Sequence, residues 1–256
     1  MPSPITHLKP ITVSIVSHGH LEMVLPLLEQ LDAFSHAVVE KVVLTLNIPE
    51  PDVLSGRKWR FPVERIENTQ PKGFGANHNQ AFQRCSSEWF LVLNPDIRFE
   101  TDVLAPLLAQ AKAESGLLTP RILEPGKTEP EQHRGVITPL EILTRRQPGY
   151  VQPKVPAWIP GLFMLFRGKA YAQIGGFDEK RFFMYGEDFD ICARTQLAGW
   201  QLQVGYGLSA VHDARRASHR NYRHMWWHVQ SLLKVWSSSS FWRLRKLMQS
   251  RSTSGP

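Results

Sequence analysis

The first hundred residues alternate between short apolar runs and longer stretches with helical spacing. Apolar runs of strand length occur at 11–16, 41–46, 63–66 and 88–93. Between them, residues 21–31 and 77–85 carry apolar positions at the period of a helix. Strands that alternate with helices are typical of a doubly wound sheet. We therefore predict an α/β fold with a mostly parallel, Rossmann-like sheet flanked by helices.

A polar turn follows each predicted strand. These turns lie at 17–20, 47–50, 68–75 and 94–96. In doubly wound sheets, ligands bind beyond the carboxyl ends of the strands, which share one edge. We expect the four turns to converge on one pocket.

The second half has a less regular pattern. Residues 124–160 are rich in proline and charge, and we interpret them as a surface insertion or mobile loop. A strand is predicted over 158–166, with helices near 168–174 and 187–198. Beyond these, six apolar residues fall on one helical face: Met225, Trp226, Val229, Leu232, Leu233 and Trp236.

Composition limits the classes of function. The 256 residues are 42% hydrophobic and 21% charged, which suits one large domain with a small appendage. No apolar run approaches the roughly 20 residues needed to cross a bilayer, and residues 1–10 do not form a secretory signal, so we expect a cytoplasmic chain. The net charge of +7 favours phosphate-bearing partners without choosing among them. Nucleic acid is disfavoured, since no helix-turn-helix, zinc-finger or RNA-binding signature is recognisable.

Asn94-Pro-Asp96 follows a predicted strand. A carboxylate at that position is well placed to hold a divalent cation that bridges two phosphates. All three residues also favour turns, so a plain turn is the alternative. His212 follows the apolar segment 202–211 and becomes a candidate ligand if it lies near Asp96.

The segment 68–79 combines glycines, amides and one cation. Gly73 and Gly75 would let the backbone approach a ligand, and the helix that follows offers N–H groups to anions. Lys72 would add positive charge. The alternative is a polar helix entry capped by Asn77.

Three acids crowd together at the predicted start of a helix. Glu187, Asp188 and Asp190 stand among aromatic residues, where a raised pKa would suit a general base. Acids at a helix start also complement its dipole, which is the simpler explanation. We interpret Asp190 and Arg194, four residues apart, as a surface ion pair. Arg215 and its basic neighbours could bind a diphosphate or form a solvated basic face.

Taken together and in order, five segments resemble family 2 glycosyltransferases of the GT-A fold, from Val13 to about Trp236. They are residues 14–20, 73–79, 93–96, 183–190 and 210–212. Within that family the chain is similar to the bacterial rhamnosyltransferases of O-antigen and surface-polysaccharide synthesis. The resemblance implies inverting transfer of L-rhamnose from dTDP-L-rhamnose to a polyprenyl-diphosphate-linked saccharide. A UDP-hexose donor is the alternative.

The resemblance also implies residue roles. Asp96 corresponds to the last acid of the metal-binding Asp-x-Asp motif, with Asn94 in place of the first, and His212 completes a site for Mg²⁺ or Mn²⁺. Asp188 corresponds to the catalytic base, with Glu187 beside it at the acceptor. The expected substrate-binding residues are Ser17, His18, Asn68, Lys72, Gly73, Gly75, Asn79, Asn94 and Arg215, the last at the donor or the acceptor diphosphate.

We expect a catalytic domain over residues 1–220 and a basic amphipathic helical segment over 221–256. Aromatic and cationic residues together suit a helix that lies in a membrane interface. We predict that this segment docks on the cytoplasmic face of the inner membrane, where a polyprenyl acceptor would be held. The alternative is that its apolar stripe packs on the catalytic domain or on the second subunit of a homodimer.

Overall fold

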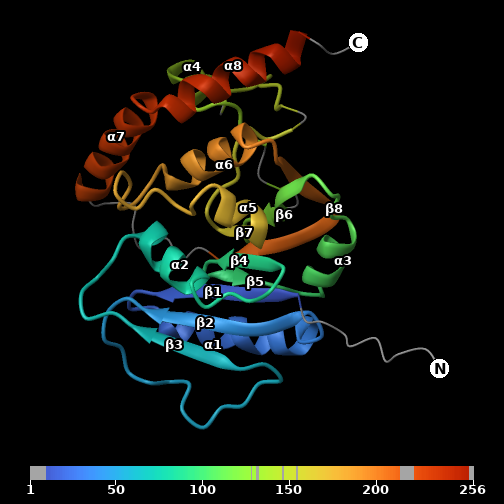
Figure 1. Cartoon of the computed structure of the whole chain (residues 1–256), viewed down its shortest axis with the longest axis vertical. Helices are drawn as coiled ribbons and strands as arrows, with labels where there is room; N and C mark the ends of the chain where they lie inside the picture. Colours follow the sequence, from blue (N-terminus) through green and yellow to red (C-terminus); the bar gives the residue numbers. More distant parts are fainter. Residues whose placement is uncertain are drawn as a thin grey trace, which may run out of the picture.

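The computed structural model describes residues 10–127, 129–130, 133–145, 147–153, 155–213 and 222–253. Its centre is an eight-stranded sheet with the order β3-β2-β1-β4-β7-β6-β8-β5. The strands are β1 (Ile11–Ser17), β2 (Val39–Leu46), β3 (Val63–Glu67), β4 (Trp89–Leu93), β5 (Ile97–Arg98), β6 (Ser115–Leu123), β7 (Phe163–Arg167) and β8 (Gln201–His212). Helices cover both faces of this sheet (Figure 1).

The helices divide between two buried clusters, one on each face. They are α1 (Leu21–Gln30), extended by a π-turn at Leu31–Ser35, α2 (Phe74–Phe82), α3 (Leu104–Ala109), α4 (Pro139–Thr144), α5 (Gly168–Gln173), α6 (Glu187–Leu197), α7 (Tyr222–Trp236) and α8 (Ser239–Thr253). Helices α1 and α3 contribute to one cluster, and α2, α5, α6, α7 and α8 to the other.

The sheet is mostly parallel, as predicted. Strands β1 to β4 form three parallel ladders, and β6 pairs parallel with β8. Strand β7 runs antiparallel to both β4 and β6, so those two strands share one direction. The carboxyl ends of β1, β2, β4, β6 and β8 therefore lie at one edge, together with the start of β7. We call this the active edge.

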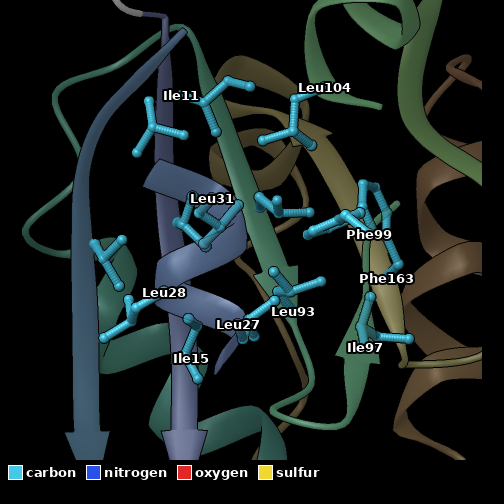
Figure 2. Packing of buried hydrophobic residues seen from close by; sticks show 14 of the residues in the cluster. Ile11, Ile15, Leu27, Leu28, Leu31, Leu93, Ile97, Phe99, Leu104 and Phe163 are labelled. Carbon is cyan, nitrogen blue, oxygen red and sulfur yellow. The ribbon is translucent and has the colours of Figure 1, made fainter. Parts of the chain in front are cut away.

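A dense apolar layer fixes the strands that lead to the active edge. Ile11 and Ile15 of β1 lie on the same face as Leu27, Leu28 and Leu31, and all five are fully buried (Figure 2). Burying a side chain of this size contributes about 1.5–3 kcal/mol. The polar turns beyond the strands therefore extend from a rigid platform.

Two predicted boundaries were wrong. Helix α2 begins at Phe74 rather than near residue 77, and Asn77 is not its cap: the Asn77 Nδ2 group donates to the carbonyl oxygen of Gly73 at 3.1 Å. Strand β7 begins at Phe163 rather than at residue 158. Pro160, which has no N–H for a strand ladder, lies in the residues before it.

The C-terminal segment packs on the other helices. Val235, Phe241 and Leu244 are buried in the cluster that contains α6. This packing corrects the predicted surface ion pair, since Asp190 is only 4% exposed. Its carboxylate accepts from Arg194 Nε at 2.7 Å and from the Ser240 hydroxyl at 2.7 Å. Within the described residues, none of the helices has the length and apolar character required to span a membrane.

Candidate active site

Asn47, at the end of β2, joins three of the polar turns at the active edge. Its Nδ2 group lies 3.1 Å from His18 Nδ1 and donates to the carbonyl oxygen of Lys72 at 2.9 Å. Its Oδ1 atom accepts from the Lys72 backbone N–H and from Asn68 Nδ2, both at 2.8 Å. Asn68 Nδ2 also lies 2.7 Å from Asn77 Oδ1. Neutral amides therefore hold residues 68–75, which we call the donor loop, against the ends of the strands.

The sequence interpretation did not assign Asn47, although its place directly after a buried strand was a usable signal. Glu50, from the same turn, was also left unassigned. Its Oε2 atom accepts from the Leu21 N–H at 2.7 Å and so satisfies a free donor at the start of α1. This side chain therefore helps to fix the first helix, while its Oε1 atom is buried without a hydrogen-bond partner among the described residues.

Ser17 and His18 lie together at the end of β1, but in different surroundings. Ser17 is fully buried, and its hydroxyl accepts from the His20 N–H at 3.1 Å. His18 is exposed at the active edge beside Asn47. The geometry thus gives Ser17 a part in shaping the turn and leaves His18 accessible to a ligand.

Asp96 and His212 meet at the active edge, although 116 residues separate them. The His212 Nε2 and Asp96 Oδ2 atoms lie 3.1 Å apart. The pairing follows from the antiparallel ladder of β5 and β8, in which Ile97 faces His212. The turn interpretation also holds, since the Ile97 N–H donates to the carbonyl oxygen of Asn94 at 3.2 Å.

The residues at this pair fit a divalent cation held together with a phosphate ligand. Asp96 Oδ1 is buried and has no hydrogen-bond partner among the described residues. A carboxylate oxygen with nothing to bind is suited to coordinate a hard cation. No group of three or more His, Cys, Asp or Glu side chains that could hold a metal occurs in the described part of the chain. Further ligands would therefore have to come from a bound diphosphate and water.

The two glycines of the donor loop make close approaches within the protein. A Cβ atom on Gly73 would stand 2.4 Å from the carbonyl oxygen of Phe183, and one on Gly75 would stand 2.5 Å from Phe177 Cβ. The first N–H of α2, that of Phe74, donates to the same Phe183 carbonyl at 3.1 Å. These glycines therefore let the donor loop pack against the segment before α6.

Asn79 and Lys72 also have partners inside the protein. Asn79 Oδ1 accepts from the Tyr171 hydroxyl at 2.8 Å and from the Phe177 N–H at 2.9 Å. Asn79 Nδ2 donates to Phe177 O and Glu179 Oε2, both at 2.9 Å, so this side chain positions the neighbouring loop. Lys72 Nζ donates to Gln80 Oε1 at 2.6 Å on the exposed side of α2. Arg215 lies outside the described residues.

Glu187 and Asp188 begin α6 at the active edge. Two left-handed residues, Tyr185 with φ 68° and Gly186 with φ 88°, turn the chain into the helix. A left-handed non-glycine residue costs of order 1–3 kcal/mol and persists where its surroundings over-determine it. Asp188 Oδ1 accepts from the Phe189 N–H at 2.8 Å, and Asp188 Cβ is 3.8 Å from the Cβ position of Gly161, just before β7.

Glu187 and Asp188 both have raised pKa values. Burial raises the pKa of Glu187, and the charge of Asp188 raises it further. Burial also raises the pKa of Asp188, against opposing backbone hydrogen bonds and the positive charge of Arg134. Glu187 Oε2 is buried without a partner among the described residues. Carboxyl groups held this way can accept or share a proton near neutral pH.

Arg134 is a site residue that the sequence interpretation missed. It pairs with Trp158 in an isolated antiparallel bridge, and its guanidinium lies 4.7 Å from the centre of the Trp158 ring. Such a stack holds a cation in place beside the acids. The surrounding residues 124–160 have no periodicity that would have indicated this pairing.

Comparison with known proteins shows similarity to glycosyltransferases over part or most of the chain. The model of glycosyl transferase family 2 matches residues 52–173. Rhamnosyltransferase WbbL of Escherichia coli (strain K12) is 25% identical over 243 residues, which cover 87% of this chain and 90% of that protein. An N-acetylglucosaminyl-diphospho-decaprenol L-rhamnosyltransferase of Mycobacterium tuberculosis is 33% identical over 132 residues, 44% of this chain and 43% of that protein.

Solved structures share the fold at lower identity. GalNAc-T7, solved with UDP, GalNAc and Mn²⁺, gives a TM-score of 0.64 at 15% identity, covering 81% of this chain and 44% of that chain. A mannosyltransferase of Pyrobaculum calidifontis, in complex with GDP-Man and Mn²⁺, gives a TM-score of 0.62 at 13% identity, covering 96% of this chain and 76% of that chain. At these identities the similarity shows the architecture of the fold alone.

Proposed function

We propose that this chain, which is similar to glycosyl transferase family 2 over residues 52–173 and shares the fold of GT-A glycosyltransferases, is an inverting rhamnosyltransferase. Its donor would be dTDP-L-rhamnose and its acceptor a polyprenyl-diphosphate-linked saccharide. The observation that carries this proposal is the meeting of Asp96, His212 and Asp188 at one sheet edge. Similarity to two proteins named as rhamnosyltransferases, in Escherichia coli and Mycobacterium tuberculosis, supports the donor.

The donor would bind over the turns that Asn47 ties together. His18 is exposed beside Asn47, and Asn68 lies in the same amide network. Because these amides already hold one another, the loop is preorganised and loses little conformational freedom on binding. Asp96 and His212 would hold Mg²⁺ or Mn²⁺ together with the donor diphosphate. That cation would supply positive charge to the leaving phosphate.

Asp188 would act as the general base. Its carboxylate takes the proton from an acceptor hydroxyl, whose oxygen forms a bond to the anomeric carbon of the donor. The bond from that carbon to the diphosphate oxygen breaks on the opposite face, and dTDP leaves with the bonding electron pair. A single displacement of this kind inverts the anomeric configuration. Glu187, with its raised pKa, would retain a proton and orient the acceptor through a hydrogen bond.

The C-terminal helices would dock the enzyme on the inner membrane, on the cytoplasmic face. Val235, Phe241 and Leu244 are used in internal packing, but Leu233 and Trp242 are 58% and 54% exposed. Exposed Arg243, Arg245 and Lys246 accompany them on α8. Apolar and cationic side chains on one surface suit an anionic lipid interface.

Substitution tests this docking better than deletion of residues 237–256, because deletion would expose the core that Phe241 and Leu244 cover. Leu233→Ser and Trp242→Ser should reduce cosedimentation with anionic liposomes and leave the melting temperature nearly unchanged. Val155→Ser, at an exposed apolar residue outside these helices, is the control. Unchanged cosedimentation would exclude this surface.

The reaction itself is tested by release of the nucleotide diphosphate. Purified enzyme with Mn²⁺ would be offered dTDP-rhamnose or UDP-hexoses, each with a GlcNAc-diphospho-lipid acceptor. We expect acceptor-dependent release of dTDP. Release from a UDP-hexose alone would replace the donor with the alternative, and release from neither donor would contradict the proposal for this acceptor.

A further inference from the structure

A cavity of about 880 Å³ is lined by residues between Arg121 and Gln152, together with residues 204–206 in a bulged part of β8. The wall begins on β6 with Arg121 and continues through Arg134, Arg145 and Tyr150. On the other side it is closed by residues 204–206, where the register between β6 and β8 shifts. The cavity therefore lies within the insertion and outside the turns that would hold the donor.

The charged side chains that line the cavity differ in whether they already have partners within the wall. Glu141 Oε1 accepts from the Gly135 N–H at 2.9 Å and from the Tyr150 hydroxyl at 2.5 Å. Glu124 forms an ion pair with Lys127. The Arg121 side chain is exposed and makes no hydrogen bond or ion pair within the residues that the structure describes. Glu124 and Glu141 thus have partners in the wall, whereas the Arg121 guanidinium, like the Glu129 carboxylate, makes no described contact and is available to a ligand.

Arg134 belongs both to the cavity wall and to the surroundings of Asp188, the proposed general base. It lines the cavity, and its positive charge acts on the carboxyl group of Asp188. A small apolar recess of about 50 Å³ continues from the cavity between Arg121, Arg134 and Trp158. A ligand that contacts both arginines would consequently have a neighbouring group within reach of the base.

On the basis of the proposed function, we propose that this cavity binds the diphosphate of the lipid-linked acceptor, with Arg121 and Arg134 as phosphate ligands. Guanidinium groups bind phosphate oxygens through paired, charge-assisted hydrogen bonds. In an in-line displacement, the donor diphosphate leaves from the face opposite the attacking hydroxyl. The attacking hydroxyl must therefore lie on the face of the anomeric carbon opposite the donor diphosphate, beside Asp188, and Arg134, which lines the cavity, acts on that same carboxyl group.

The test is calorimetric binding of three ligands to the full chain: hexyl-diphospho-GlcNAc, O-hexyl-GlcNAc without phosphate, and dTDP. Arg121→Gln and Arg134→Gln should weaken binding of the diphosphate sugar by about 10- to 100-fold, the range for hydrogen bonds to charged groups. Binding of the other two ligands should not change. Arg57→Gln, an exposed arginine paired with Glu29, is the matched control.

Equal weakening for both sugars, weaker binding of dTDP, or no effect on any ligand would each overturn the cavity assignment. If Arg134→Gln unfolds the protein, Arg134→Lys and the exposed Arg121 variant decide the question. Arginine-dependent binding without sugar transfer would support the cavity and refute the proposed reaction. Sugar transfer to O-hexyl-GlcNAc, with no binding of the diphosphate sugar, would support the proposed reaction and refute the cavity assignment.

Discussion

The donor loop, residues 68–75, and the segment 183–188 meet at the active edge. They differ in whether their polar groups have hydrogen-bond partners. The donor loop is pinned by neutral amides that satisfy one another through Asn47 and Asn68. The other segment buries two carboxyl groups, leaves Glu187 Oε2 without a described partner and places Tyr185 in a left-handed conformation. Satisfied amides stabilise one geometry at any pH, whereas buried acids are costly and change with protonation. The amide network therefore suits the positioning of a ligand, and the buried acids suit the proton transfer that we propose.

The two regions also depend on each other. Gly73 packs against the Phe183 backbone, and the Phe74 N–H donates to the Phe183 carbonyl oxygen. The donor loop therefore helps to hold the segment that leads into Glu187 and Asp188. Substitutions in each region should separate positioning from chemistry.

Asp188→Asn should have the largest effect. The amide keeps the shape of the side chain but cannot take up the proton, so turnover should fall by about 10²–10⁴-fold. The measurement is kcat for acceptor-dependent nucleotide release, with the melting temperature recorded in parallel. Asp52→Asn, which alters an exposed carboxylate paired with Arg65, should retain normal turnover. Near-normal kcat in folded Asp188→Asn enzyme would refute the base assignment.

Asp96→Asn should come next. Loss of the charged oxygen beside His212 should lower kcat/KM by about 10²–10³-fold, as for loss of one stabilising group at the developing charge. The concentration of Mn²⁺ required for half-maximal activity should rise. A titration with Mn²⁺ measures this shift, and identical curves for the variant and the parent enzyme would show that Asp96 does not hold the cation.

Gly73→Ala tests the contact between the two regions. The new methyl group would stand 2.4 Å from the Phe183 carbonyl oxygen, so one segment must move. We expect a loss of about 1–3 kcal/mol in the free energy of unfolding, the cost of overpacking. Gly149→Ala is the control, because it strains a left-handed residue with φ 82° where no atom lies within 4 Å. A destabilisation no larger than in the control would mean that the contact is readily relaxed.

Glu187→Gln should have the smallest effect, visible in the pH dependence of stability. Because burial raises the pKa of Glu187, the folded protein keeps a proton that the unfolded chain releases above the ordinary value of 4.5. The free energy of unfolding should therefore decline as pH rises above 4.5, and the glutamine variant should decline less. Melting temperatures at pH 5, 6.5 and 8 measure the difference. Parallel curves would indicate that Glu187 ionises normally.

Several features of the fold and the site could be predicted from the sequence. The apolar runs predicted β1 to β4 and the helices between them, because period and length are local properties of the chain. Residue types directly after predicted strands indicated Asp96 and His212 as site candidates, and the acids at the predicted start of a helix indicated Glu187 and Asp188. The crowding of acids in segment 183–190 also predicted the raised pKa of Glu187 and Asp188, as the structure confirms.

The tertiary structure decided what depends on partners distant in sequence. The Asp96–His212 contact spans 116 residues, and it required the β5–β8 ladder. The contacts of Gly73 with Phe183 and of Asn79 with Phe177 were likewise absent from the sequence pattern, because they join segments about 100 residues apart. Asp190 became buried because α8 covers it. Periodicity determines which face of an element is apolar, whereas only packing determines which element covers that face.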